Sequence, residues 1–302
     1  MKTNGKCALV TGGTSGIGLE LARCFAADGY DLVLVARDEA ELRNTASELG
    51  IQHGVKVITI AKDLFDEQAS QEVYDEVKSK GIEVNALVNN AGQGEYGFFH
   101  ETDIERDMDI VKLNIIAPLY LTKLFVKDMI AKGEGKILNL ASVVSKNPAP
   151  LFSVYSASKA FIYSWSIALR NELADKGITV TALLPGATET DFFNKAGMLN
   201  TKENVEYAHA DPADVAKTGY DALMNNEEKV IAGAKNKMMA TMANITPDSA
   251  LAANMRDHMQ NVDGPEGKAG ASEGEAEREG LRQAAGHTPG TPSSGNTPRG
   301  EE

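Results

Sequence analysis

Cysteine is scarce in this chain, with only Cys7 and Cys24 among 302 residues. Cys7 stands in an apolar, strand-like run and Cys24 in a helix-like run, which is typical of small buried side chains in a reducing compartment. The five histidines are scattered, and no group of Cys and His has the spacing of metal ligands. The composition therefore predicts neither a structural disulfide nor a metal site.

Positive charge is also in short supply, since 30 Lys and Arg stand against 43 Asp and Glu and give a formal net charge of -13. Such a surface repels a nucleic-acid backbone and an anionic membrane. The apolar run near the N-terminus is too short for a signal peptide, and no later stretch approaches the length of a membrane span. We expect a soluble, cytoplasmic protein whose ligand is a small molecule.

Short β-branched runs alternate with longer segments of helical periodicity. This rhythm predicts a single-domain α/β fold, a Rossmann-like, doubly wound parallel sheet of about seven strands with helices on both faces. The expected strands are 6–10, 31–36, 55–60, 84–89, 136–140, 178–184 and 229–231. The expected helices are the segment after Gly16 and 38–49, 66–80, 103–131, 153–175 and 211–225. In such a sheet, ligands bind in one crevice beyond the carboxyl ends of the strands.

Composition divides the chain into three parts. Residues 1–234 carry the alternating pattern and form the expected dinucleotide-binding and catalytic domain. Residues 235–262 are rich in Met and Ala and predict a helical extension, whose methionines either cover the substrate crevice or pack in a core or interface. Those methionines are Met238, Met239 and Met242. Residues 263–302 are rich in Gly, Pro, Ser, Thr and Glu and predict a disordered tail.

The first strand runs directly into a glycine-rich turn, Thr11–Gly18, and then into an amphipathic helix. Glycine lets the backbone approach a ligand closely, and a helix N-terminus offers free amides and the positive end of its dipole. The turn therefore predicts a pyrophosphate site, although its spacing departs from GxGxxG. The candidate cofactor contacts here are Gly12, Thr14, Ser15, Gly16, Ile17 and Gly18.

The end of the second strand distinguishes NAD from NADP. An acidic residue there would bind the ribose 2′-hydroxyl, but the chain has Ala36 followed by Arg37, whose guanidinium suits a 2′-phosphate. We therefore expect NADP. Asp38 is either the N-cap of the next helix or a ribose ligand. Asp63, after the third strand, is either a turn residue or an acceptor for the adenine amino group.

Tyr155 and Lys159 are four residues apart at the start of a long helical segment, so they share one face. A tyrosine with a pKa of about 10 is a poor acid or base at neutral pH, and a neighbouring ammonium lowers that pKa. Ser142 follows the strand 136–140 at its carboxyl edge, where its hydroxyl can hold a substrate oxygen. A Tyr–Lys pair at this spacing is also a common solvated surface pair, so the pair alone does not define a site.

Together with the turn, these residues resemble the classical short-chain dehydrogenase/reductase family, in its NADP-preferring type. The resemblance extends from about Lys6 to Ile231. Its motifs occur in the family's order and spacing. They are TGxxxGxG at Thr11–Gly18, NNAG at Asn89–Gly92, an asparagine at Asn114, a serine at Ser142, YxxxK at Tyr155–Lys159 and PG at Pro185-Gly186.

The resemblance implies an oxidoreductase that transfers hydride between NADP(H) and a carbonyl or secondary alcohol. Tyr155 would donate or accept the proton, and Ser142 would orient the oxygen. Lys159 would hold the nicotinamide ribose and lower the tyrosine pKa, while Asn114 would anchor a water. Tyr155 and Lys159 also belong to the family's cofactor contacts, and the remaining ones correspond to Asp63, Leu64, Asn90, Ala91, Gly92, Pro185, Gly186, Thr188 and Thr190. A homodimer or homotetramer, with the helix carrying Phe161 and Trp165 at a subunit interface, is also implied.

The segments 94–99, 143–152 and 187–199 are expected to face the substrate, and they contain many apolar side chains and few charges. They favour an apolar or lipid-like ketone, or a 3-oxoacyl-type substrate. The alternative is a sensor or scaffold of the same fold that binds NADP(H) without catalysis. A missing tyrosine, lysine or glycine turn would favour that alternative, and none is missing, so we expect an enzyme.

Overall fold

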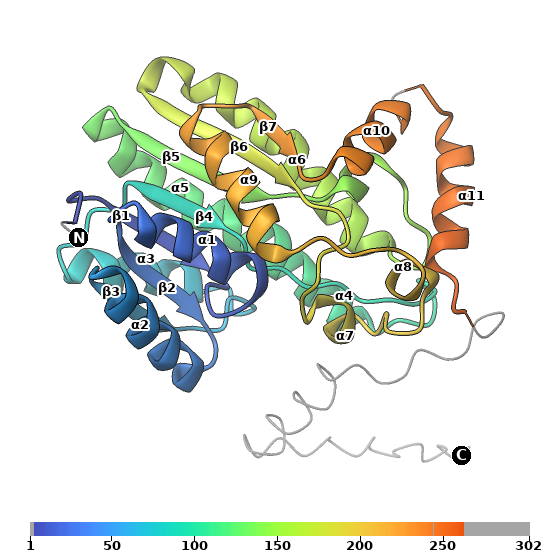
Figure 1. The fold of residues 1–302 in the computed structure, drawn as a ribbon, viewed down its shortest axis with the longest axis horizontal. Coiled ribbons are helices and arrows are strands. Elements are labelled where there is room, and N and C mark those ends of the chain that lie inside the picture. The colour runs from blue at the N-terminus through green and yellow to red at the C-terminus, as the bar shows by residue number, and fades with distance from the viewer. Residues whose placement is uncertain (1–2, 244, 263–302) are drawn as a thin grey trace, which may run out of the picture.

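The computed structural model describes residues 3–243 and 245–262 and has a seven-stranded parallel sheet at its centre (Figure 1). The strand order is β3-β2-β1-β4-β5-β6-β7. The strands are β1 (Cys7–Thr11), β2 (Asp31–Ala36), β3 (Val57–Ala61), β4 (Ala86–Asn89), β5 (Gly135–Leu140), β6 (Ile178–Leu184) and β7 (Lys229–Ile231). The doubly wound α/β fold expected from the sequence is confirmed.

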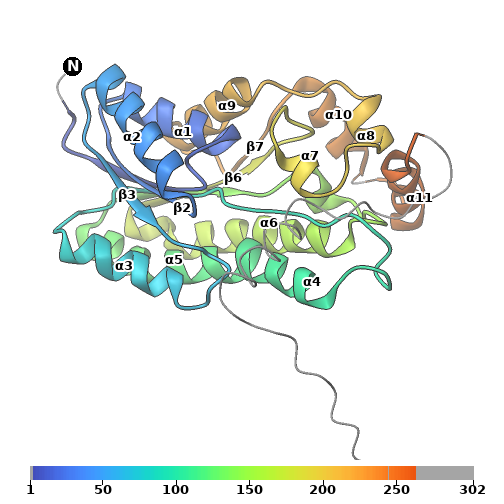
Figure 2. The same cartoon turned by 90° about the horizontal axis from the view of Figure 1, so that it is seen from below.

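Helices cover both faces of the sheet, as Figure 2 shows. On one face lie α1 (Gly16–Ala27), α2 (Glu39–His53) and α9 (Pro212–Met224). On the other face lie α3 (Ala69–Ser79), α5 (Ala117–Lys132) and α6 (Ser153–Leu173). Because both faces are covered, the apolar residues of a central strand are consecutive instead of alternating; Ala8, Leu9 and Val10 of β1 are all fully buried.

The strand order reverses between β1 and β4, which lie side by side although two strands separate them in sequence. Ligands of open α/β sheets bind beside such a reversal, beyond the carboxyl ends of the strands. Two helices that begin near this edge have aspartate caps. The Asp38 carboxylate accepts a hydrogen bond from Glu41 N at 2.8 Å, and Asp211 accepts one from Ala213 N at 2.7 Å. Of the two roles considered for Asp38, the structure shows the helix cap.

The segment 103–131, expected to be one helix, is interrupted in the structure. It consists of α4 (Ile104–Val111), a π-helical turn at Lys112–Ile116, and α5. A π-turn contains one extra residue and changes the direction in which the side chains point. Hydrophobic periodicity does not reveal a single extra residue, which is why the sequence predicted a continuous helix.

Short helices gather beyond the carboxyl end of the sheet, on the right in Figure 1. They are α7 (Phe192–Lys195), α8 (Lys202–Val205), α10 (Ala234–Ala243) and α11 (Asp248–Met259). Elsewhere, a 3-10 turn at Val143–Lys146 follows β5, and another at Ala174–Lys176 precedes β6. The segment 235–262 therefore contains two helices, with Pro247 preceding the second. The tail 263–302, expected to be disordered, lies outside the described residues. Within those residues, none of the helices has the length and apolar character needed to cross a membrane.

Candidate active site

A cleft of about 700 Å³ opens at the carboxyl ends of the strands. It is lined by residues that follow β1, β2, β3, β4, β5 and β6, as expected at the reversal of strand order. Every cofactor contact expected from the sequence lines this cleft, and so do Ser142, Tyr155 and Lys159. Asn114 does not line it: its side chain is buried behind the cleft, at 2% exposure.

The glycine-rich turn has no room for side chains at its centre. A Cβ atom on Gly18 would lie 2.1 Å from the carbonyl oxygen of Gly12, and Gly12 and Gly16 have positive φ angles of 64° and 53°. Helix α1 starts at Gly16 without an acidic residue in its first turn and without a side-chain cap from Ser15. The first residues of α1 line the cleft, so the positive end of the helix dipole faces the cleft without a side chain that neutralises it. This arrangement fits a pyrophosphate group.

The NNAG segment braces this turn. Thr11 Oγ1 accepts hydrogen bonds from the backbone amides of Asn90 and Ala91, both at 3.0 Å. The Asn90 side-chain amide donates to the carbonyl oxygens of Thr11 and Gly12, at 2.8 and 3.1 Å. These bonds join the ends of β1 and β4, so the carbonyl group of Gly12 has little freedom to move.

On the same side of the cleft as this turn, Arg37 lies over the ring of Phe65, with its guanidinium carbon 5.7 Å from the ring centroid. Asp63 accepts a hydrogen bond from the backbone amide of Phe65 at 3.1 Å and also lines the cleft. Both roles considered for Asp63 fit this position. Phe65 was not among the expected site residues; the signal for it was an aromatic residue two positions after Asp63, in the loop that follows a strand.

The side chain of Tyr155 is buried beside Ser142 in the cleft. Burial raises the pKa of the Tyr155 phenol well above its usual range, while its hydrogen bond with the Ser142 side chain acts in the opposite direction. The Ser142 hydroxyl also accepts from Val144 N at 3.3 Å. Burial by itself thus favours the protonated phenol, which is suited to donate its proton to a substrate oxygen.

Lys159 supplies the nearby positive charge. Its Nζ atom lies 5.7 Å from the centroid of the Tyr155 ring and donates a hydrogen bond to the carbonyl oxygen of Leu140 at 2.9 Å. Burial lowers the pKa of Lys159 to about 8. At neutral pH the side chain is thus still largely an ammonium ion, and it stabilises the phenolate form of its neighbour.

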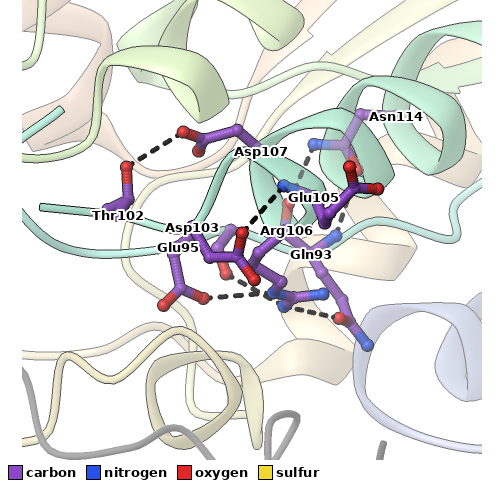
Figure 3. A network of polar contacts seen from close by, with 9 residues as sticks. Gln93, Glu95, Thr102, Asp103, Glu105, Arg106, Asp107 and Asn114 are labelled. Atoms are coloured by element: carbon purple, nitrogen blue, oxygen red, sulfur yellow. Dashed lines mark hydrogen bonds and ion pairs between the residues drawn. The ribbon is translucent and has the colours of Figure 1, made fainter. Parts of the chain in front are cut away.

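Asn114 holds the loop next to Lys159 (Figure 3). It accepts a hydrogen bond from Gln93 N at 3.0 Å and donates to Gln93 O at 2.9 Å, and it also donates to Ser158 Oγ at 2.9 Å. A Cβ atom on Gly92 would lie 3.2 Å from both Asn114 Oδ1 and Lys159 Nζ. The π-turn thus places the amide of Asn114 near Lys159, and Gly92, which has no side chain, lies beside both.

A buried ion pair, absent from the expected site, supports the same loop (Figure 3). Arg106 of α4 donates to Glu95 at 3.1 Å, to the side chain of Gln93 at 2.8 Å and to the carbonyl oxygen of Gly94 at 3.3 Å. The Arg106 and Glu95 side chains are only 5% and 11% exposed. In the sequence Arg106 stands among acidic residues, a pattern typical of a solvated helix surface. Its buried partners are provided by a loop that precedes the helix.

The end of the cleft next to Tyr155 has many apolar side chains. Its lining includes Val144, Phe152, Phe192, Phe193 and Met198, and the rings of Phe152 and Tyr155 have centroids 4.4 Å apart. These side chains come from two of the segments expected to face the substrate. Phe99, in the third segment, is 68% exposed and does not line the cleft.

The model of the short chain dehydrogenase family matches residues 6–200, more than half of the chain. A very-long-chain 3-oxoacyl-CoA reductase of Phaeosphaeria nodorum is 37% identical over 180 residues, covering 58% of this chain and 53% of that protein. The very-long-chain 3-oxoacyl-CoA reductase of Homo sapiens is 35% identical over 188 residues, covering 60% and 59%. The match thus spans between half and three fifths of these curated relatives.

Solved structures show the same likeness. A short-chain dehydrogenase from Sphingobium yanoikuyae in complex with NADPH has a TM-score of 0.72 at 30% identity, covering 80% of this chain and 93% of that chain. L-Sorbose reductase from Gluconobacter frateurii, complexed with NADPH and L-sorbose, has a TM-score of 0.69 at 29% identity, covering 77% and 97%. With a match over most of its sheet and helices, the chain belongs to the short-chain dehydrogenase family of oxidoreductases.

Proposed function

We propose that this protein uses NADPH to reduce an apolar ketone of the 3-oxoacyl type. The observation that carries the proposal is the meeting of Ser142, Tyr155 and Lys159 at one wall of a cleft whose other end has a glycine-rich turn and Arg37. A sensor or scaffold of the same fold has no need for a buried phenol hydrogen-bonded to a serine beside a buried ammonium.

The nicotinamide, when bound, supplies a hydride to the carbonyl carbon. The chain's own residues handle the oxygen and its proton. The Ser142 hydroxyl donates a hydrogen bond to the carbonyl oxygen and orients it, and the Tyr155 hydroxyl transfers its proton to that oxygen as the alcohol forms. The Lys159 ammonium stabilises the phenolate that remains, and Asn114 keeps the neighbouring loop in place.

Two observations support NADP as the cofactor. The second strand ends at Ala36, which has no carboxylate for a ribose 2′-hydroxyl, and the next residue is Arg37, which lines the cleft over Phe65. Two of the solved relatives are described as NADPH complexes. In cells the NADPH pool is usually kept reduced, which favours reduction as the direction of the reaction.

Two further observations support the substrate class. The end of the cleft next to Tyr155 is formed by phenylalanine and methionine side chains, which suit an apolar chain next to the reacting carbonyl. The curated relatives are named very-long-chain 3-oxoacyl-CoA reductases, although this chain matches only part of their length.

The direct test is the oxidation of NADPH, followed by its absorbance, in the presence of 3-oxoacyl-CoA thioesters. We expect oxidation that depends on the thioester and that is slower with NADH. Binding of NADPH without turnover of any carbonyl compound would contradict the proposal and favour the sensor.

The NADP preference is tested with Arg37→Ala. We expect the Kd for NADPH to rise about tenfold, because an exposed, charge-assisted contact with the 2′-phosphate is lost, while the Kd for NADH stays the same. Fluorescence titration with both dinucleotides measures this change. Arg43→Ala is the matched control, since Arg43 pairs with Glu39 on the exposed side of α2, outside the cleft. Equal weakening of NADPH and NADH in Arg37→Ala would argue against a 2′-phosphate site.

A cytoplasmic location, a homo-oligomer and the three-part division of the chain stay predictions. For the oligomer, the support is an aromatic pair on α6, in which Phe161 is exposed and Trp165 is partly buried. The ring centroids of Phe161 and Trp165 lie 6.4 Å apart, and Phe161 is among the exposed large apolar side chains.

A further inference from the structure

The last described helix, α11, returns to the substrate end of the cleft and lies next to α8 in both views (Figures 1 and 2). Backbone hydrogen bonds join the two segments. Lys202 N donates to Gln260 O at 2.8 Å, and Val262 N donates to Asn200 O at 3.0 Å. The end of α11 is therefore fixed to the start of α8 and to Asn200 in the loop before it, just after the segment 187–199 that is expected to face the substrate.

Side chains strengthen this attachment. His258 of α11 stacks on Tyr207, with ring centroids 4.7 Å apart, and its Nε2 atom lies 3.1 Å from the tyrosine hydroxyl. The other ring nitrogen of His258 lies 3.4 Å from the carboxylate of Glu203, and Lys202 forms an ion pair with Asp257 at 2.8 Å. Since polar contacts of this kind are directional, they define how α11 is rotated about its own axis.

The rotation buries two methionines of α11 in the apolar cluster to which Tyr155 belongs. Met255 and Met259 are buried in an apolar cluster that also contains Phe152, Phe193 and Tyr155. Met259 is 3% exposed and also lines the cleft. The methionines that the sequence suggested for this role, Met238, Met239 and Met242, do not line the cleft. Met238 and Met242 are 61% and 56% exposed on α10, and Met239 is half-buried.

We infer that Met259, supported by Met255, forms the far wall of the substrate site and limits the length of the apolar group that the site accepts. This inference rests on the proposed function, because it assumes that the reacting carbonyl lies at Tyr155 with its apolar remainder extending toward α11. Methionine suits such a wall, because its unbranched, polarizable side chain adapts to apolar chains of different shape.

The test compares kcat/KM for 3-oxoacyl-CoA thioesters of increasing acyl length in the full-length protein. Met259→Ala removes the end of the wall, so we expect the ratio of kcat/KM for long over short thioesters to rise about tenfold. Met259→Phe adds bulk at the same point and should lower that ratio. Met242→Ala is the matched control, since it removes an exposed methionine from α10, and its ratio should equal that of the wild type.

A second readout separates this inference from the proposed reaction. Calorimetric titration of saturated acyl-CoA thioesters of increasing length into the NADPH complex measures binding without turnover, because these thioesters have no 3-oxo group to reduce. The same changes in the long-to-short ratio are expected for their affinities. Thermal unfolding identifies any variant that does not fold. Absent turnover in the wild type would contradict the proposed function alone. An unchanged length preference of folded Met259→Ala and Met259→Phe in the binding titrations would overturn the inference.

Discussion

Tyr155→Phe is expected to lower kcat for carbonyl reduction by about a thousandfold, because it removes the group that donates the proton to the substrate oxygen. The phenylalanine ring keeps the packing of the tyrosine, whose centroid lies 4.4 Å from that of Phe152 and 5.2 Å from that of Phe192. The affinity for NADPH should therefore change far less than kcat. Steady-state kinetics and a fluorescence titration of the same preparation measure the two quantities separately.

Tyr163→Phe is the matched control for this change. Tyr163 lies on the same helix, is half-buried, and accepts a hydrogen bond from Lys229 Nζ at 3.2 Å away from the cleft. Its variant should keep the wild-type kcat. If Tyr155→Phe retained more than about a tenth of the wild-type kcat, the assignment of the proton donor would be wrong, because general acid catalysis contributes at least about a hundredfold.

Gly18→Ala is expected to weaken NADPH binding by more than about a hundredfold, which corresponds to about 2.7 kcal/mol. The added Cβ would lie 2.1 Å from Gly12 O and 2.3 Å from Asn90 Nδ2, far inside van der Waals contact. The Gly12 carbonyl cannot retreat easily, because Asn90 donates a hydrogen bond to it at 3.1 Å. The turn must therefore change its shape, and the amides directed at the pyrophosphate move with it.

Gly50→Ala tests whether the loss of NADPH affinity arises from the glycine-rich turn and not from any Gly→Ala change. Gly50 is in helix α2, and a Cβ atom there would meet only the carbonyl oxygen of Val55, at an ordinary 3.5 Å. This variant should bind NADPH like the wild type and should raise the free energy of unfolding by about 0.5–1 kcal/mol, since alanine is the better helix former. Equal NADPH affinity in Gly18→Ala and Gly50→Ala would contradict the role given to the turn.

The strands show how far local pattern predicts the fold. The expected ranges for β2, β6 and β7 coincide with the observed Asp31–Ala36, Ile178–Leu184 and Lys229–Ile231. The expected strands 6–10 and 55–60 are displaced, to Cys7–Thr11 and Val57–Ala61. A run of apolar, β-branched residues identifies a strand, but its ends depend on which neighbouring strand provides hydrogen-bond partners.

The helix containing Asn114 shows where local pattern is insufficient. Its hydrophobic repeat continues from 103 to 131, yet the structure contains a π-turn at Lys112–Ile116. The amide of Asn114 is positioned by hydrogen bonds to Gln93 and Ser158, which come from a different loop and a different helix. The residues next to Asn114 in sequence do not indicate such long-range contacts.

The sequence by itself determined the alternating strands and helices, the glycine-rich turn and Ser142, Tyr155 and Lys159 as candidates for catalysis, because these depend on residue type and short-range spacing. Asn114 became a candidate only through the resemblance to the family. Tertiary structure decided which side chains meet: Arg37 with Phe65, Arg106 with Glu95, and α11 with the substrate end of the cleft. Each of these pairs joins separate elements. Their contacts arise only when the elements pack together, since burial and ion pairing depend on distance in space and not on distance along the chain.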